Sequence, residues 1–426
     1  MILTKYKLGE ILDVTRGASL SGEYYATEGE YIRLTCGNFD YQNNCFKENK
    51  SKDNLYYVGD FKSEFLMEEG DIITPLTEQA IGLLGSTAII PESGKYIQSQ
   101  DVAKIICKED LLDKDFAFYL ISSALVKQQL SAAAQQTKIR HTSPDKIKDC
   151  TVWIPELSEQ KRIGKLLRSI DRKIELNRAI NQNLEAMAKQ LYDYWFVQFD
   201  FPNEEGKPYK SSGGEMVWNE KLKRNMPKEW CAMTIGEVEN NIITGKTPSC
   251  ADEDNFGGDI PFITIDDIRG NLFVFNSQRT LSTKGAESQT KKYLPSGSLS
   301  VSCIGTIGVM GFIAKLSQTN QQINSIVFEN EHNREFVYFA LKLYFENAKA
   351  KTGNVFANMS KDEFASIKVV YSPKQILQEF HNKVVAIFDN IKNNIDEINA
   401  LTKQRDELLP LLMNGQAMVN SDLSDG

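Results

Sequence analysis

The chain has 426 residues, enough for two or three domains of about 150 residues, each with its own core. Its 49 basic and 57 acidic residues give a net charge of -8, which does not favour a nucleic-acid-binding protein that acts alone. Its seven cysteines include no Cys-x-x-Cys pair, so neither a disulfide framework nor a zinc cluster is indicated, and we expect a reducing, cytoplasmic location. The most apolar stretch, residues 299–314, contains three glycines and is too short to span a bilayer, so we expect no membrane contact.

The first 157 residues have the pattern of a mixed α/β domain with short strands and frequent turns. Strands are predicted at residues 31–35, 71–74, 86–90 and 102–106, a helix at 115–121 and a last strand at 150–155. Residues 158–198 contain no proline and place apolar side chains every three or four positions, which predicts one long helix. About forty residues at about 1.5 Å each make a rod of roughly 60 Å, which one small domain cannot cover. We therefore interpret this helix as a spacer.

The second half of the chain repeats the first. A connector rich in Pro, Gly, Lys and Ser is predicted at 199–229 and a second domain at 230–373. Leu8-Gly9-Glu10 recurs as Ile235-Gly236-Glu237, and Ser143-Pro144-Asp145 recurs as Ser360-Lys361-Asp362. The predicted elements of this domain are strands at 261–265, 298–302, 323–328 and 367–373 and a helix at 334–341. A second long helix at 374–418, in which Pro410 should cause an end or a kink, and a frayed tail at 419–426 complete the pattern.

Each long helix carries one asparagine at the same position of its apolar seam, Asn177 in the first and Asn394 in the second. If the helices pair antiparallel, their midpoints meet. We therefore predict an antiparallel coiled coil in which the two asparagines hydrogen-bond across the seam and fix its register. The alternative is that each helix packs on its own domain and the asparagines face solvent.

The sequence offers few residues for catalysis. Gly245-Lys246-Thr247 resembles the end of a phosphate-binding loop, but the required glycine five residues earlier is Asn240, and Pro248 follows at once. Asp145, Glu159 and Lys161 match the loose pattern of metal-dependent nucleases, although an acidic residue at a helix start is also favoured for structural reasons. The three histidines, His141, His332 and His381, are too dispersed for a zinc site. We predict no catalytic residue and no metal ligand.

Basic and amide side chains gather in polar loops in both halves. Five basic residues lie between Lys127 and Lys148, and five lie between Arg269 and Lys292. Cations neutralise phosphates and amides suit adenine edges, so these loops indicate DNA binding, the alternative being solvated surface loops. The residues expected to contact DNA are Gln135, Gln136, Thr137, Lys138, Arg140, Lys246, Gln321, Lys351, Asn354 and Asn358.

A set of motifs in fixed order covers nearly the whole chain. The motifs are Pro155 with Glu159 to Ile163, Trp195 to Phe201, Gly213 to Trp218, Thr244 to Ser249, Gly258 to Thr264, Ile304 to Gly308 and Asn320 to Asn324. In this order, and with the duplication, the chain resembles the specificity subunit of a type I restriction-modification enzyme.

The resemblance implies an α+β fold of two similar mixed α/β target recognition domains separated by two long helices that form an antiparallel coiled coil. Each domain would read one half of a split DNA target, and because the two domains differ in sequence, the target would be asymmetric. The implied partners are double-stranded DNA, two methylation subunits that bind S-adenosylmethionine and methylate adenine N6, and restriction subunits that use ATP and Mg²⁺. The chain itself would bind no cofactor and catalyse nothing.

Two other functions remain open at this stage. One is a protein-protein scaffold whose duplicated domains bind polypeptides and whose helices drive dimerisation. The other is a self-contained nuclease that uses Asp145, Glu159 and Lys161.

Overall fold

The computed structural model describes residues 2–50, 53–78, 82–133, 140–352 and 358–419. The chain divides into two compact units. Unit 1 is Met1–Ile174 with Leu401–Gly426, and unit 2 is Glu175–Ala400. Among the described residues, no helix is both long enough and apolar enough to cross a membrane.

Unit 1 is built on an antiparallel four-stranded sheet in the order β10-β8-β12-β2. Its strands are β2 (Leu12–Arg16), β8 (Ile72–Pro75), β10 (Ala88–Ile89) and β12 (Val102–Cys107). A second four-stranded sheet consists of β3 (Tyr25–Ala26), β4 (Tyr31–Arg33), β7 (Tyr56–Tyr57) and β11 (Tyr96–Ile97). The remaining strand pairs are β1 (Thr4–Lys7) with β14 (Thr151–Ile154), β5 (Phe39–Asp40) with β6 (Cys45–Phe46), and β9 (Thr77–Glu78) with β13 (Arg140–His141).

The helices of unit 1 cover its main apolar core. They are α1 (Leu8–Ile11), α2 (Lys114–Ile121), α3 (Ala124–Ala133), α4 (Pro144–Lys148) and the first part of α5 (Leu157–Tyr192). Helix α2 begins where the Asp113 carboxylate accepts a hydrogen bond from the Phe116 amide at 2.9 Å, and six of its eight residues are buried. Ile163 and Leu167 of α5 pack into the same core, together with Leu412 from the end of α11 (Lys374–Met413).

Unit 2 contains a five-stranded sheet in the order β18-β25-β22-β23-β20. Its strands are β18 (Ile242–Thr244), β20 (Phe273–Val274), β22 (Leu299–Ser302), β23 (Met310–Ile313) and β25 (Ile323–Ile326). The other strands are β15 (Met216–Asn219), β16 (Arg224–Pro227), β17 (Cys231–Thr234), β19 (Phe256–Ile263), β21 (Arg279–Leu281), β24 (Gln318–Thr319) and β26 (Lys368–Tyr371). The helices are α6 (Ile235–Val238), α7 (Ile265–Ile268), α8 (Thr283–Glu287), α9 (Arg334–Thr352) and α10 (Lys361–Ala365), with the remaining parts of α5 and α11.

The predicted connector packs into unit 2. Residues 216–227 form the β15-β16 hairpin, and a π-helical turn, Asp193–Val197, follows α5. Phe201 stacks between Tyr209 and Trp230, with ring centroids 4.7 and 4.9 Å apart. Since Phe201 and Trp230 are buried in the largest core of unit 2, this segment is a structural part of that unit.

The duplication is visible in the structure. Strand β1 pairs antiparallel with β14 just before α5, and β17 pairs antiparallel with β26 just before α11. The repeated Leu/Ile-Gly-Glu motif forms α1 and α6, in which Glu10 and Glu237 accept hydrogen bonds from the backbone amides at the helix starts, at 2.6 and 2.7 Å. The repeated serines, Ser143 and Ser360, cap α4 and α10. All predicted strands and helices named above overlap observed ones.

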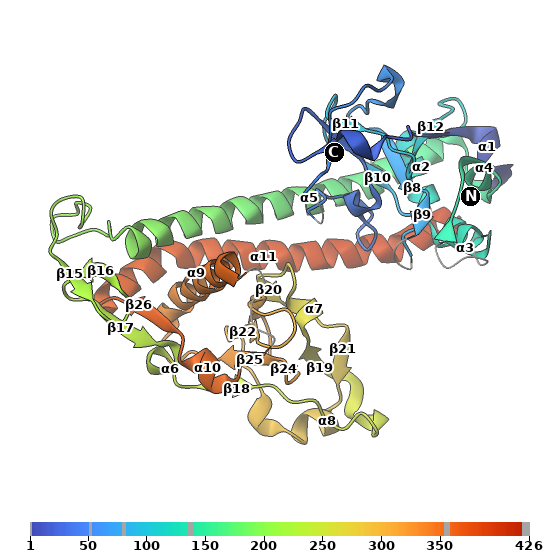
Figure 1. Ribbon diagram of the computed structural model, residues 1–426. Coiled ribbons are helices and arrows are strands. Elements are labelled where there is room, and N and C mark those ends of the chain that lie inside the picture. The colour runs from blue at the N-terminus through green and yellow to red at the C-terminus, as the bar shows by residue number, and fades with distance from the viewer. Residues whose placement is uncertain (1, 51–52, 79–81, 134–139, 353–357, 420–426) are drawn as a thin grey trace. The chain divides into compact units, whose positions relative to one another are not determined.

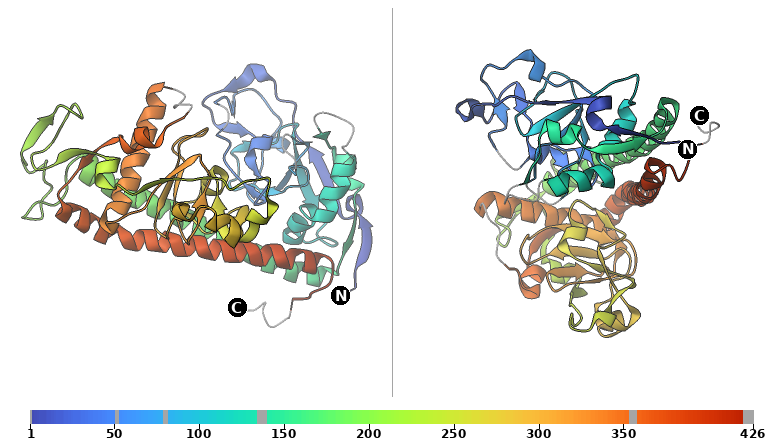
Figure 2. Two further views of the ribbon diagram at one scale, coloured as in Figure 1. Left: turned by 90° about the horizontal axis from the view of Figure 1, so that it is seen from below. Right: turned by 90° about the vertical axis from the view of Figure 1, so that its right-hand side faces the viewer.

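The two long helices run antiparallel in unit 2 (Figures 1 and 2). The Asn177 amide donates to Glu397 Oε2 at 2.8 Å, and the Asn394 amide donates to Asn181 Oδ1 at 2.8 Å. The prediction that Asn177 and Asn394 bond to each other is therefore wrong, because the helices pair almost one turn away from the register that would place these two residues opposite each other. Each asparagine nevertheless makes one hydrogen bond across the helix pair.

One further helix prediction needs correction. The three-or-four-residue apolar repeat predicted for the first long helix includes Ile180 and Met187, but these side chains are 38% and 57% exposed. Apolar positions that repeat every seven residues drift by about 20° per repeat around a straight α-helix. Some of them therefore turn away from the partner helix. Pro410, predicted to end or kink the second long helix, lies in the last turn of α11, which ends three residues later at Met413.

Candidate nucleic-acid interface

Strand pairing in unit 2 brings several loops to one edge of the five-stranded sheet. Thr244 at the end of β18 pairs with Asn324 near the start of β25, and Ser302 at the end of β22 pairs with Ile323. Strand β23 starts at the same edge, since Met310 pairs with Val301. Strand β20 runs parallel to β23, so the loop that leads into β20 lies at the same edge of the sheet. The loops at this edge are residues 245–248, 269–272, 303–309 and 320–322.

Lys246 and Gln321 lie on two of these loops, which are bonded to each other. The Lys246 amide donates to Thr319 O at 2.9 Å, and the Thr247 hydroxyl donates to Gln321 Oε1 at 2.6 Å. A Cβ on Gly245 would lie 2.1 Å from Asn320 O, so only glycine permits this approach. The Gly-Lys-Thr sequence thus serves loop packing, and the exposed Lys246 and Gln321 come together as candidate DNA contacts.

Asn358 lies beside the loop 303–309. Asn358 is exposed and forms a bridge with Ile304, and the next amide, that of Met359, donates to Cys303 O at 2.8 Å. Lys351 is in the last turn of α9. Asn354 lies outside the described residues.

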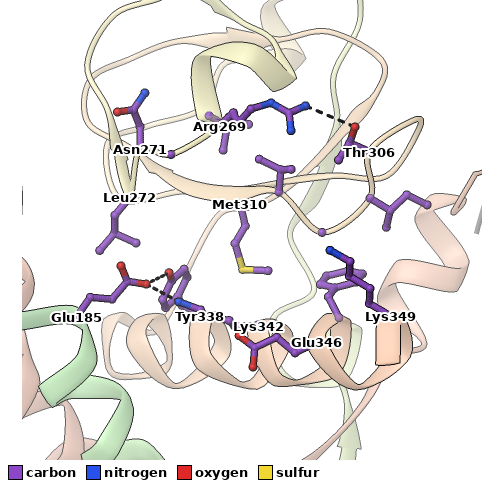
Figure 3. Close-up of a pocket in the computed structure, with 16 residues that line it drawn as sticks. Glu185, Arg269, Asn271, Leu272, Thr306, Met310, Tyr338, Lys342, Glu346 and Lys349 are labelled. Atoms are coloured by element: carbon purple, nitrogen blue, oxygen red, sulfur yellow. Dashed lines mark hydrogen bonds and ion pairs between the residues drawn. The ribbon is translucent and has the colours of Figure 1, made fainter. Parts of the chain in front are cut away.

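A pocket of about 520 Å³ opens between this edge and α9 (Figure 3). Arg269 points toward the loop 303–309 and donates to the Thr306 hydroxyl at 3.4 Å. On the other wall, Glu185 accepts from Lys342 Nζ and from the Tyr338 hydroxyl, both at 2.6 Å. Burial and the charge of Glu185 raise the pKa of Tyr338 well above its usual value, so the hydroxyl remains a donor.

Unit 1 has an edge of the same construction. Arg16 at the end of β2 pairs with Ala103, and Pro75 at the end of β8 pairs with Val102. A Cβ on Gly17 would lie 2.2 Å from Gln98 O, so Gly17 and Gly245 have equivalent roles in the two units.

Arg140 belongs to this first edge. It pairs with Glu78 in the strand pair β13-β9, just beyond the end of β8. The other four predicted DNA-contacting residues of this half lie outside the described residues: Gln135, Gln136, Thr137 and Lys138.

Three of the described cations in the basic clusters are engaged by other parts of the fold. Burial lowers the pKa of Lys127, and its ammonium donates to Asn44 Oδ1 at 3.5 Å. Lys284 is paired with Asp252 at 2.9 Å and Asp254 at 3.3 Å. The Arg279 guanidinium stacks over Phe256 at 4.4 Å. The sequence thus overestimated the charge that these clusters offer to a ligand.

The comparison with known protein families decides the identity. A family model described as the type I restriction modification DNA specificity domain matches residues 3–186 and again 227–406. The chain belongs to the type I restriction-modification DNA specificity family. The predicted family and the predicted fold are therefore confirmed.

Two curated relatives and one solved structure illustrate the similarity. The chain is 30% identical over 374 residues to the specificity subunit of the type I restriction enzyme HindI from Haemophilus influenzae, covering 75% of this chain and 81% of that protein. It is 22% identical to the MjaIX specificity subunit from Methanocaldococcus jannaschii, covering 75% and 73%. A crystal structure of the S subunit from M. genitalium has the same fold, with a TM-score of 0.58 at 16% identity over 97% of this chain and 96% of the other.

Asp145 and Glu159, which match the loose pattern of metal-dependent nucleases, each form an ion pair within their own helix. Asp145 lies in the first turn of α4 and pairs with Lys148 at 3.3 Å. Glu159 pairs with Arg162 at 2.8 Å within α5. These pairs connect residues one helical turn apart, as the helix-start interpretation of the acidic residues expects.

The histidines were predicted to be too dispersed for a zinc site, but two of the three lie close together in the fold. The rings of His332 and His381 lie 5.0 Å apart between centroids, with Glu331 beside them. No sequence pattern indicates this proximity, because the turn that carries His332 and the helix that carries His381 meet only in the fold.

Proposed function

We propose that this chain is the DNA-binding specificity subunit of a type I restriction-modification complex and that each unit reads one half of a split target. The observation that carries the proposal is the sheet edge repeated in both halves of a chain of this family, with exposed Arg16 at the first edge and exposed Lys246, Gln321 and Asn358 at the second. In the proposal, the recognition domains are residues 1–157 and 230–373, and the spacer helices are residues 158–198 and 374–418.

The chemistry of the edges suits a DNA ligand. Lys246, Arg269 and Arg16 supply cations that neutralise phosphates, and Gln321 and Asn358 supply amides that pair with adenine edges in the major groove. The two Gly-containing loops differ in sequence, Arg16 to Ser19 against Thr244 to Thr247. The two half-sites should therefore differ, which makes the target asymmetric.

The catalytic steps belong to partner subunits in this proposal. Two methylation subunits bind S-adenosylmethionine and transfer a methyl group to adenine N6, and restriction subunits use ATP and Mg²⁺. This chain binds none of these cofactors, and the complex works in the cytoplasm. Partners that share the phosphate contacts explain how a chain with a net charge of -8 takes part in DNA binding.

Single-molecule sequencing of N6-methyladenine tests the proposal. A host that carries this chain with its methylation partner is compared with the same host without this chain. We expect a split, asymmetric motif that is methylated only when the chain is present. If an active methylation partner is shown to be expressed and no motif depends on this chain, the DNA-specificity proposal is wrong and the scaffold hypothesis takes its place.

A further inference from the structure

Three potential metal ligands meet at the junction of α9 and α11 in unit 2. Glu331 and His332 lie in the 3-10 turn η7 (Glu331–Asn333), which leads directly into α9. His381 lies in the second turn of α11. One ligand atom from each residue lies within 4.8 Å of the other two.

His381 is held in the orientation of a metal-binding histidine. Its Nδ1 is 2.6 Å from Oε2 of Glu335, whose side chain is fully buried. This bond leaves Nε2 as the ring nitrogen available to a ligand. A carboxylate on the far nitrogen fixes the ring and its tautomer, as in many zinc sites.

Glu335 is suited to this positioning role. Arg334 also donates to it, at 2.8 Å. Burial opposes ionisation, but the bond from His381 and the charge of Arg334 outweigh it and hold the pKa of Glu335 below its usual value.

His332 shows an unsatisfied buried atom at the same place. Its Nδ1 is buried and has no hydrogen-bond partner among the residues that the structure describes. A buried polar nitrogen without a partner costs free energy, and a bound cation would satisfy the ring.

The turn itself is fixed by neighbouring bonds. The buried Asn333 amide donates to Glu239 Oε1 at 2.8 Å, and the Tyr371 hydroxyl donates to Asn333 Oδ1 at 3.1 Å. Glu331 is exposed, so its carboxylate can rotate toward the two rings. Ligands at about 2.1 Å from one tetrahedral ion lie about 3.4 Å apart, which a small side-chain rotation reaches from 4.8 Å.

We propose that Glu331, His332 and His381 form a binding site for a divalent transition-metal ion of the zinc type. Two imidazoles and one carboxylate are a donor set that zinc accepts in proteins, and the fourth position is left for water. The ion links the start of α9 to α11 and so strengthens the join between the sheet-bearing part of unit 2 and its long helix.

Metal titration of the full-length chain tests this proposal. Because the thiols of exposed Cys231 and Cys250 are potential zinc ligands, both are replaced by Ser in the starting protein. We expect one equivalent of Zn²⁺ in calorimetry, a rise in melting temperature, and visible absorption bands of a four-coordinate Co²⁺ ion. His141→Ala is the matched control, since it removes the histidine outside the cluster and should change none of these signals.

The ligand variants give the decisive comparison. His332→Ala and Glu331→Gln alter residues that are not fully buried, and each should weaken Zn²⁺ affinity at least tenfold while the chain stays folded. Glu335→Gln should weaken affinity about 10- to 100-fold and shift the Co²⁺ bands, as loss of a positioning residue does. Absence of one-to-one binding at micromolar Zn²⁺, or binding unchanged in His332→Ala, would overturn the proposal.

Discussion

The carboxylate of Asp171 is buried in unit 1 and is bound from two sides. Arg405 Nη1 donates to Oδ1 at 2.8 Å, and the Tyr119 hydroxyl donates to Oδ2 at 2.5 Å. Burial and the negative charge of Asp171 raise the pKa of Tyr119 well above its usual value, so this hydroxyl stays protonated. The three groups therefore depend on each other.

Asp171→Ala should destabilise unit 1 strongly, because it leaves the Arg405 charge buried with one acceptor fewer. We expect a loss of about 3–5 kcal/mol in the free energy of unfolding, measured by guanidinium denaturation. Asp406→Ala is the matched control. Asp406 also pairs with Arg405 at 2.8 Å but is 58% exposed, so its loss should cost about 1 kcal/mol or less. Equal effects of the two variants would contradict this account.

Cysteine reactivity should follow burial. Burial raises the pKa of both Cys150 and Cys303 to about 11, whereas Cys231 and Cys250 are exposed. At pH 8 iodoacetamide should alkylate the exposed pair, because only a thiolate attacks. Alkylation of the buried pair should increase about tenfold per pH unit toward pH 11. Peptide mass spectrometry measures both rates, and faster labelling of Cys303 than of Cys250 at pH 8 would refute the prediction.

The roles of individual residues were harder to predict from the sequence than the helices and strands. Gly245 is required by a contact with Asn320, which is distant in the chain, so the local Gly-Lys-Thr pattern could not reveal this role. The meeting of His332 with His381 likewise depends on tertiary packing. By contrast, the repeated Glu10 and Glu237 act within one helical turn, and the repeat made them visible in the sequence.

At the scale of elements, the helix pair of unit 2 contains two different polar contacts. Asn394 bonds to a neutral partner, Asn181, whereas Asn177 bonds to a carboxylate, that of Glu397. Replacing both members of the neutral pair by Leu removes donor and acceptor together. The double variant should therefore be neutral or more stable, while Asn177→Leu should lose about 1–3 kcal/mol. Thermal melting distinguishes the two, and destabilisation of the double variant by more than Asn177→Leu would contradict the prediction.

Adding a single methyl group should disturb the hydrogen-bonded loops at the sheet edges of the two units. Gly17→Ala and Gly245→Ala each place a Cβ about 2 Å from a backbone oxygen, so the bonded loops must separate. We expect a loss of about 1–3 kcal/mol in stability and weaker DNA binding by the assembled complex, measured by titration with its target. Gly22→Ala is the control, because its Cβ would make only ordinary contacts at 3.8 Å with the Tyr25 ring. An effect as large in the control would show that the loop contact is not the cause.

The positions of the helices and strands were predicted better than the contacts that they make with one another. Apolar periodicity located the strands and both long helices, because burial imposes that pattern locally. The hairpin at 216–227 and the packing of Phe201 on Trp230 had no such pattern, so the segment was interpreted as a connector. The register of the helix pair was missed by almost one turn, since it depends on contacts between segments far apart in sequence.

At the scale of the whole molecule, the duplication is the main basis for the proposed function. Both copies belong to one DNA specificity family and present equivalent loop edges. The central claim is that each copy reads its own half of the target. The copies should then be exchangeable one at a time.

The most direct measurement is the methylated motif of a chain in which residues 230–373 come from another specificity subunit of this family. The account predicts that one half of the motif changes while the other half stays as it was. The reciprocal exchange of residues 1–157 should change only the other half. A motif in which both halves change after one exchange, or in which neither changes, would contradict the claim that the two units read DNA independently.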